Sequence, residues 1–174
     1  VTELASTITE RAAGNPFFAE EIVRDLAERG VLVGRRGDYE CRQKAGEISV
    51  PGTLQATIAA RIDRLSPRAK HTLCAAAVIG MRFDADLLTA LGADPDVDEV
   101  GTAELVDQVR FTGHAEYVFR QPLIRTVAYE SQLKSDRAAL HRRLAEAIES
   151  HGSSGENAAM IAEHLEAAGD LRAA

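Results

Sequence analysis

The sequence contains little of what several protein classes depend on. Its 174 residues include no tryptophan, only two cysteines, and 5% aromatic residues. Cys41 and Cys74 lie far apart and outside any metal-ligand spacing, so we expect reduced thiols and no disulfide. No apolar run approaches the roughly 18 residues of a membrane span, and we expect no signal peptide. These absences favour a soluble cytoplasmic module with no membrane partner.

Motifs that carry catalysis are also absent from the sequence. It has no Gly-x4-Gly-Lys-Ser/Thr phosphate loop, no Gly-x-Ser-x-Gly elbow and no His-Glu-x2-His helix. The acidic stretch 94–99 lacks the glycine and terminal glutamate of a calcium loop. His141, beside Arg142 and Arg143, is predicted to be a helix-surface residue. We therefore expect no catalytic residue, no metal site and no cofactor in the isolated chain, and we do not expect it to be an enzyme.

Hydrophobic periodicity predicts a mainly α fold. Apolar residues recur at helical spacing within 4–12, 18–26, 54–65, 73–79, 123–128 and 140–148. Two short hairpins are predicted, one around residues 34–38 and one around residues 113–116. Phe83 and Asp84 are expected to lead into a short helix, and a further helix is expected from Glu99 to Val109. Three helices followed by a hairpin is the order of a winged helix.

The start of the second helix is the most specific local pattern. Asn15 is suited to cap a helix, Pro16 fits its first position, and Glu20 and Glu21 lie near its positive end. Gly14 is placed to end the preceding helix. Any helix can begin in this way, so one interpretation is that Pro16 only initiates a helix.

Several blocks, in this order and spacing, resemble the signalling ATPases with numerous domains, the STAND class, in the branch of large LuxR-type regulators and multidomain class III adenylate cyclases. The resemblance covers the chain from about residue 8 to residue 169. Its most specific blocks are Gly-Asn-Pro-Phe-Phe-Ala-Glu-Glu (14–21), Val-Pro-Gly-Thr-Leu-Gln-Ala-Thr-Ile (50–58), Ile-Asp-Arg-Leu-Ser (62–66), Ala-Ala-Ala-Val-Ile-Gly (75–80) and Phe-Arg-Gln-Pro-Leu-Ile-Arg-Thr-Val-Ala-Tyr (119–129). Members commonly have histidine before the last proline, where this chain has Gln121.

The resemblance implies a piece of a longer protein, downstream of an ATPase core. It implies a helical lid end with a hairpin at 1–45, a winged-helix-like domain at 46–134, and a helical connector with the start of a tetratricopeptide-like repeat at 135–174. In that family the proline of the Gly-x-Pro motif approaches the base of bound ATP or ADP. Gly14, Asn15 and Pro16 would therefore belong to a nucleotide site whose Mg²⁺ and phosphate contacts lie elsewhere in the parent protein.

Two functions follow from these patterns. The first is a non-catalytic regulatory arm that links the nucleotide state of an upstream ATPase core to downstream helical repeats and an effector domain, for transcription regulation or cyclic-nucleotide synthesis. The second is a DNA-binding winged helix. The net charge of −7, the acidic character of the candidate recognition helix at about Glu99 to Val109, and the second hairpin's tip, which has no lysine or arginine, favour the first. We also expect weak self-association through the C-terminal helix.

Overall fold

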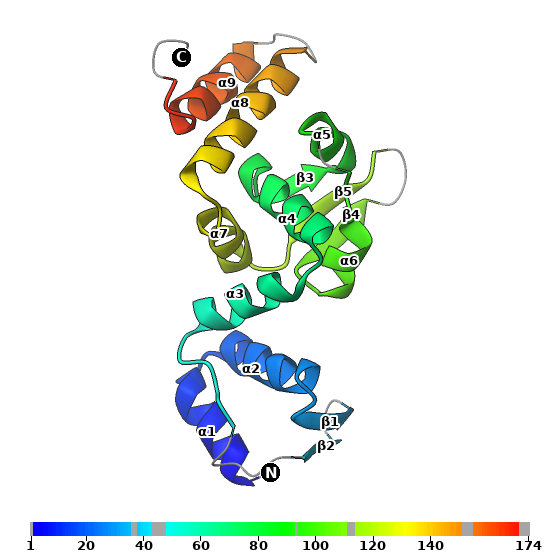
Figure 1. The fold of residues 1–174 in the computed structure, drawn as a ribbon, viewed down its shortest axis with the longest axis vertical. Helices are drawn as coiled ribbons and strands as arrows, with labels where there is room; N and C mark the ends of the chain where they lie inside the picture. The colour runs from blue at the N-terminus through cyan, green and yellow to red at the C-terminus, as the bar shows by residue number, and fades with distance from the viewer. Residues whose placement is uncertain are drawn as a thin grey trace. The chain divides into compact units, whose positions relative to one another are not determined.

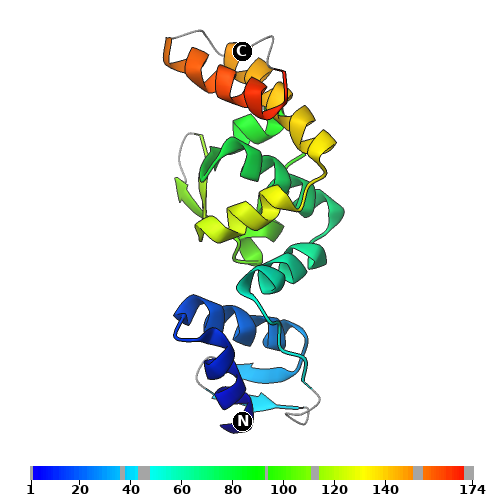
Figure 2. The same ribbon diagram turned by 90° about the vertical axis from the view of Figure 1, so that its left-hand side faces the viewer.

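The computed structural model describes residues 2–35, 38–42, 48–92, 94–110, 114–150 and 155–170. The described residues are mainly helical, with two small antiparallel sheets (Figures 1 and 2), which confirms the predicted fold class. The chain forms two compact units, Val1–Arg61 and Ile62–Ala174. The predicted three-part division stays a prediction, because residues 43–47 lie outside the described residues. No helix in the described ranges is long and apolar enough to cross a membrane.

The first unit contains α1 (Thr2–Ala12), α2 (Pro16–Glu28), the β1 (Leu32–Arg35) and β2 (Asp38–Cys41) hairpin, and most of α3 (Leu54–Arg64). One apolar stripe from each of the first two helices forms its core together with the start of β1. The core residues are Leu4, Ile8, Ala12, Phe18, Ile22, Leu26, Val31 and Leu32. The periodicity of the sequence predicted this stripe on both helices.

The hairpin depends on one glycine. Gly34 lies opposite Tyr39 with a φ of 131°, in the region that favours glycine. A Cβ atom built on it would lie 2.2 Å from the carbonyl oxygen of Asp38. A larger residue at position 34 would therefore force the two strands apart.

The second unit begins with the end of α3 and continues through α4 (Pro67–Ile79), β3 (Arg82–Asp84), α5 (Ala85–Ala90) and α6 (Val97–Thr102). β4 (Val106–Arg110), β5 (Glu116–Phe119) and α7 (Pro122–Glu130) follow. The three strands pair in the order β3-β5-β4, with both pairs antiparallel. Three helices with a strand between the first two, followed by a hairpin, match the element order of a winged helix.

The short helix expected after Phe83 and Asp84 forms as α5, which Asp84 caps by accepting a hydrogen bond from the Leu87 amide at 2.7 Å. The sequence did not predict that Arg82–Asp84 also forms a strand, which pairs with β5. The helix predicted from Glu99 to Val109 ends at Thr102, and Val106 begins β4. The chain turns at Glu104, where φ is 54°. Pairing with β5, which lies later in the sequence, determines both strands, so local spacing missed β3 and wrongly extended the helix prediction into β4.

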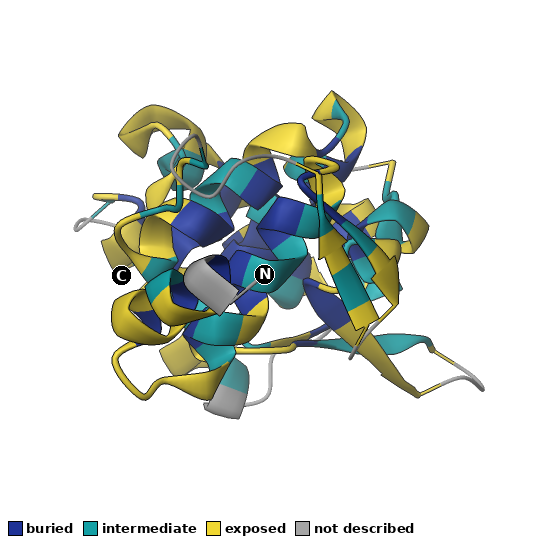
Figure 3. Cartoon of the chain, turned by 90° about the horizontal axis from the view of Figure 1, so that it is seen from below, coloured by how far each residue is buried: buried dark blue, intermediate teal, exposed yellow. Residues whose placement is uncertain are grey.

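The last two helices, α8 (Lys134–Ser150) and α9 (Gly155–Ala167), lie side by side in both ribbon views (Figures 1 and 2). Ile161 and Leu165 of α9 are half-buried, Ala168 is buried, and Met160 is 47% exposed. Buried residues occupy the inner faces of the helices, whereas their outer faces are exposed (Figure 3). Whether α9 opens a repeat array and self-associates stays a prediction.

Candidate functional site

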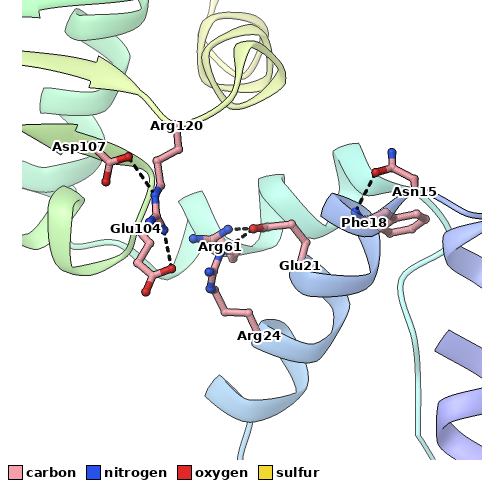
Figure 4. Close-up of polar contacts among 8 residues, drawn as sticks. All are labelled: Asn15, Phe18, Glu21, Arg24, Arg61, Glu104, Asp107 and Arg120. Carbon is pink, nitrogen blue, oxygen red and sulfur yellow. Dashed lines mark hydrogen bonds and ion pairs between the residues drawn. The ribbon is translucent and has the colours of Figure 1, made fainter. Parts of the chain in front are cut away.

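The junction between α1 and α2 holds the predicted site residues Gly14, Asn15 and Pro16. The chain reverses through two left-handed residues, Ala13 with a φ of 48° and Gly14 with a φ of 82°. Asn15 then caps α2, because its Oδ1 accepts a hydrogen bond from the Phe18 amide at 3.3 Å (Figure 4). Pro16 occupies the first turn as predicted. The structure therefore brings the three residues together on an exposed turn.

A buried ion pair lies one turn beyond Pro16. The Glu21 side chain is completely buried, and its carboxylate accepts a hydrogen bond from Arg24 of the same helix at 2.7 Å. Its second oxygen pairs with the guanidinium of Arg61, which belongs to α3 and is 3% exposed (Figure 4). Both arginines neutralise a carboxylate that would otherwise be costly to bury. The ion pair therefore ties α2 to α3.

A second buried carboxylate follows on the same face of α2. Asp25 is 2% exposed, and Arg29 donates to it at 3.1 Å. The same nitrogen of Arg29 donates to the carbonyl oxygen of Ser49 at 2.8 Å. This contact joins the end of α2 to the segment that precedes α3.

The sequence analysis placed Glu21 near the positive end of α2 but did not predict that Glu21 and Asp25 are buried. The available signal was their spacing of four residues from each other and their adjacency to Ile22 and Leu26, which puts them on the stripe. The position of Arg61 on α3 shows why Glu21 can be buried there, and Arg29 neutralises Asp25.

The turn at residues 14–16 presents backbone groups and the proline ring at the surface. Gly14, Asn15 and Pro16 carry no ionisable side chain, and the carboxylate of Glu21 is engaged by two arginines. Among the described residues, no group of three or more His, Cys, Asp or Glu side chains is arranged to hold a metal ion. An exposed proline beside a capped helix start suits an apolar contact with a flat ring.

The winged-helix-like part of the second unit presents acidic groups where a DNA reader needs basic ones. The short α6 is capped by Asp96 and exposes Asp98. Arg120, just after β5, donates to Glu104 at 2.6 Å and to Asp107 at 3.1 Å, so its charge is neutralised by its own domain (Figure 4). The position equivalent to a recognition helix would therefore repel phosphates.

We predict that the chain does not bind duplex DNA at physiological salt, because α6 and its surroundings carry negative charge. Fluorescence anisotropy with random and AT-rich duplexes, at about 50 and 150 mM salt, tests this. Saturable binding that weakens steeply with salt would contradict it. A variant with Asp98→Lys and Glu104→Lys is the control, since added charge should give weak, salt-dependent binding if the geometry itself permits contact.

Comparison with known proteins finds similarity to part of one long protein and gives no activity. No family model matches the chain, and no solved structure matches it. A Rhizobium meliloti (strain 1021) protein, named only as the uncharacterized protein R02095, is 28% identical over 173 residues. This similarity covers 92% of the chain but 16% of that protein. Nearly all of this chain therefore resembles one part of a much longer polypeptide.

Proposed function

We propose that the chain is a non-catalytic regulatory arm of a large ATP-binding signalling protein of the STAND class. It would link the nucleotide state of an upstream ATPase core to downstream helical repeats and an effector domain. Three features support the proposal. They are the Gly14–Pro16 turn, the order of helices and strands in the second unit, which matches a winged helix, and the similarity of this chain to 16% of a longer protein. The nucleotide, ATP or ADP with Mg²⁺, would be held mainly by the upstream core.

The observation that carries the proposal is the Glu21–Arg61 ion pair. Glu21 lies on the helix that Pro16 begins, and Arg61 lies on α3. Helix α3 contributes residues to both compact units, with Arg61 the last residue of the first and Ile62, 1% exposed, the first of the second. A change at the turn that displaces α2 would therefore act directly on the helix that continues into the second unit.

We predict that the isolated chain binds neither ATP–Mg nor ADP measurably. A proline and a capped turn supply a small part of a nucleotide site, and the phosphates have no lysine loop to bind. Isothermal titration calorimetry of the chain with each nucleotide is the measurement. A dissociation constant in the low micromolar range, about −8 kcal/mol, would show that a phosphate site exists within these residues.

In the full-length protein, we predict that Pro16→Ala accelerates nucleotide release by about tenfold, which corresponds to about 1.4 kcal/mol. The expected cause is loss of the apolar contact with the base, because the helix start itself should tolerate alanine at a cost below about 1 kcal/mol. Stopped-flow release of a fluorescent ATP analogue measures the rate.

The matched control is Pro67→Ala. Pro67 also begins a helix, is also exposed, and also follows a capping side chain, since Ser66 Oγ accepts from the Ala69 amide at 3.1 Å. It lies in the second unit, so its replacement should leave nucleotide release unchanged. Equal release rates for the wild type and both variants would show that Pro16 only initiates α2. The proposal that Pro16 contacts the nucleotide would then be wrong.

A further inference from the structure

Two arginines of the second unit lack the acidic partner that most of its other arginines have. Five arginines of this unit form ion pairs with Asp or Glu side chains, namely Arg68, Arg82, Arg110, Arg120 and Arg142. Arg125 of α7 and Arg137 of α8 form none with any residue that the structure describes. The whole chain carries a net charge of −7, so these two arginines form a local exception to its acidic character.

Backbone carbonyl groups hold both arginines in place. Nε of Arg125 donates to the carbonyl oxygen of Ala77 at 3.0 Å, and Nη1 of Arg137 donates to that of Tyr129 at 3.3 Å. The remaining guanidinium nitrogens make no hydrogen bond within the described ranges, and none of them is a buried atom without a partner. These nitrogens therefore reach the surface, where they can donate to a ligand.

The ring of Tyr129 forms the apolar part of the same surface. The guanidinium carbon of Arg137 lies 4.4 Å from the ring centroid, and that of Arg125 lies 6.0 Å from it. All three side chains are half-buried. The Tyr129 hydroxyl lies 2.9 Å from Nε2 of His141, which fixes the position of the ring. Arginine and tyrosine are enriched among the residues that contribute most to binding between proteins.

Neighbouring helices leave the positive charge of this cluster without a counter-charge. The pKa of His141 is lowered by burial and by the charge of His164, and then by the charges of both arginines, so these charges lie near its ring. Glu163 of α9 acts on His164, but it forms no ion pair with either arginine in the described part of the chain. A guanidinium group binds a carboxylate through two parallel hydrogen bonds, and such a pair is stronger where water is partly excluded.

We propose that Arg125, Tyr129 and Arg137 form a docking surface for an acidic protein segment. Asp or Glu side chains of that segment pair with the two guanidinium groups, and a neighbouring apolar side chain covers the ring of Tyr129. A peptide is favoured over a single inorganic anion, because the two arginines belong to different helices and a small ion would leave the ring uncovered. The surface does not depend on nucleotide binding by the parent protein.

Two synthetic peptides of equal length test the preference for acidic side chains. The probe is acetylated Glu-Glu-Leu-Glu-Glu-Leu-Glu-Glu, and the matched probe has Gln in place of every Glu. ¹H–¹⁵N correlation spectra of the whole chain record the backbone amides and the Nε–H groups of the arginines. We expect saturable binding of the Glu peptide with a dissociation constant at or below about 1 mM, and the largest side-chain shifts at Arg125 and Arg137. The Gln peptide should bind at least tenfold more weakly.

Variants of the protein locate the surface. Arg125→Gln and Arg137→Gln should each weaken binding of the Glu peptide threefold or more, and the double variant should abolish saturable binding. Arg137→Lys keeps the charge but cannot form two parallel hydrogen bonds, so it should weaken binding less than Arg137→Gln. Arg82→Gln is the matched control, because Arg82 is an arginine of the same unit that already pairs with Glu116. It should change the affinity less than twofold.

Three results would overturn the proposal. Absence of a saturable shift with the Glu peptide at several millimolar would show that the cluster docks no acidic segment. Unchanged affinity in the double variant, with its backbone spectrum intact, would place the peptide elsewhere. Inorganic phosphate that binds as tightly as the Glu peptide, with the same shifts at both arginines, would show that the cluster takes any small oxyanion and does not select a protein segment.

Discussion

Replacing Arg61 with alanine should destabilise the first unit by about 3–5 kcal/mol, the usual cost of leaving a buried charge without its partner. Glu21 is completely buried, and Arg61 is 3% exposed. Without Arg61, the partly exposed Arg24 would be left to neutralise the buried carboxylate. Amide hydrogen exchange of α1 and α2 measures this loss of stability within the first unit. A local measurement is needed because the chain has two compact units, and its global unfolding need not be two-state.

Two further variants separate charge from packing. Arg64→Ala removes an exposed arginine from the same helix and should change exchange by less than about 0.5 kcal/mol. Glu21→Met combined with Arg61→Met should be less destabilising than Arg61→Ala, because the pair is removed together and replaced by apolar volume. Unchanged protection of α2 in Arg61→Ala would mean that Arg24 alone neutralises Glu21, and the link from α2 to α3 would lose its physical basis.

Acidification should loosen the packing of α9 on α8. His141 of α8 is 5% exposed, its Nε2 lies 2.9 Å from the Tyr129 hydroxyl, and its Nδ1 lies 3.0 Å from Nδ1 of His164 on α9. Two ring nitrogens at this distance share one hydrogen, so the pair tolerates neutral imidazoles and opposes two charged ones. The sequence-based expectation of a surface position for His141 was therefore wrong.

The pKa values give the direction and the pH range. Burial, followed by the charges of His164, Arg137 and Arg125, lowers the pKa of His141 from 6.5 to about 4. Burial also lowers the pKa of His164, against an opposing contribution from Glu163. The folded state therefore favours neutral rings. The neutral rings therefore stabilise the folded state fully above pH 6.5, and this contribution to the free energy of unfolding is lost progressively as the pH falls from 6.5 to about 4. For His141 the total loss is about 3 kcal/mol.

The measurement is hydrogen exchange of α9 amides at pH 7.5 and pH 5, corrected for intrinsic exchange rates. His141→Phe keeps a ring beside Tyr129, whose centroid lies 5.8 Å from that of His141, and should remove most of the pH dependence. His114→Gln is the matched control, since His114 is an exposed histidine of the same unit and its loss should leave the dependence intact. Equal protection of α9 at both pH values in the wild type would contradict the prediction.

The sequence by itself determined the helices whose signals are local. Asn15 with Pro16 begins α2 at the predicted residues, and Ser66 with Pro67 begins α4 through the same local pattern, because capping and proline geometry involve neighbours within three positions. The apolar stripes of α1, α2 and α7 were equally readable, since burial of one helix face requires a period near 3.6 residues.

The tertiary structure decided everything that depends on a distant partner. Glu21 is buried because Arg61, 40 positions later, reaches it, and His141 is buried against His164, 23 positions later. β3 is a strand because β5 pairs with it. Residues 82–84 are too few to show a strand pattern in the sequence. The cost of burying a polar group, or of leaving a strand edge unpaired, is offset only by a partner brought near by folding. Spacing along the chain cannot report such a partner.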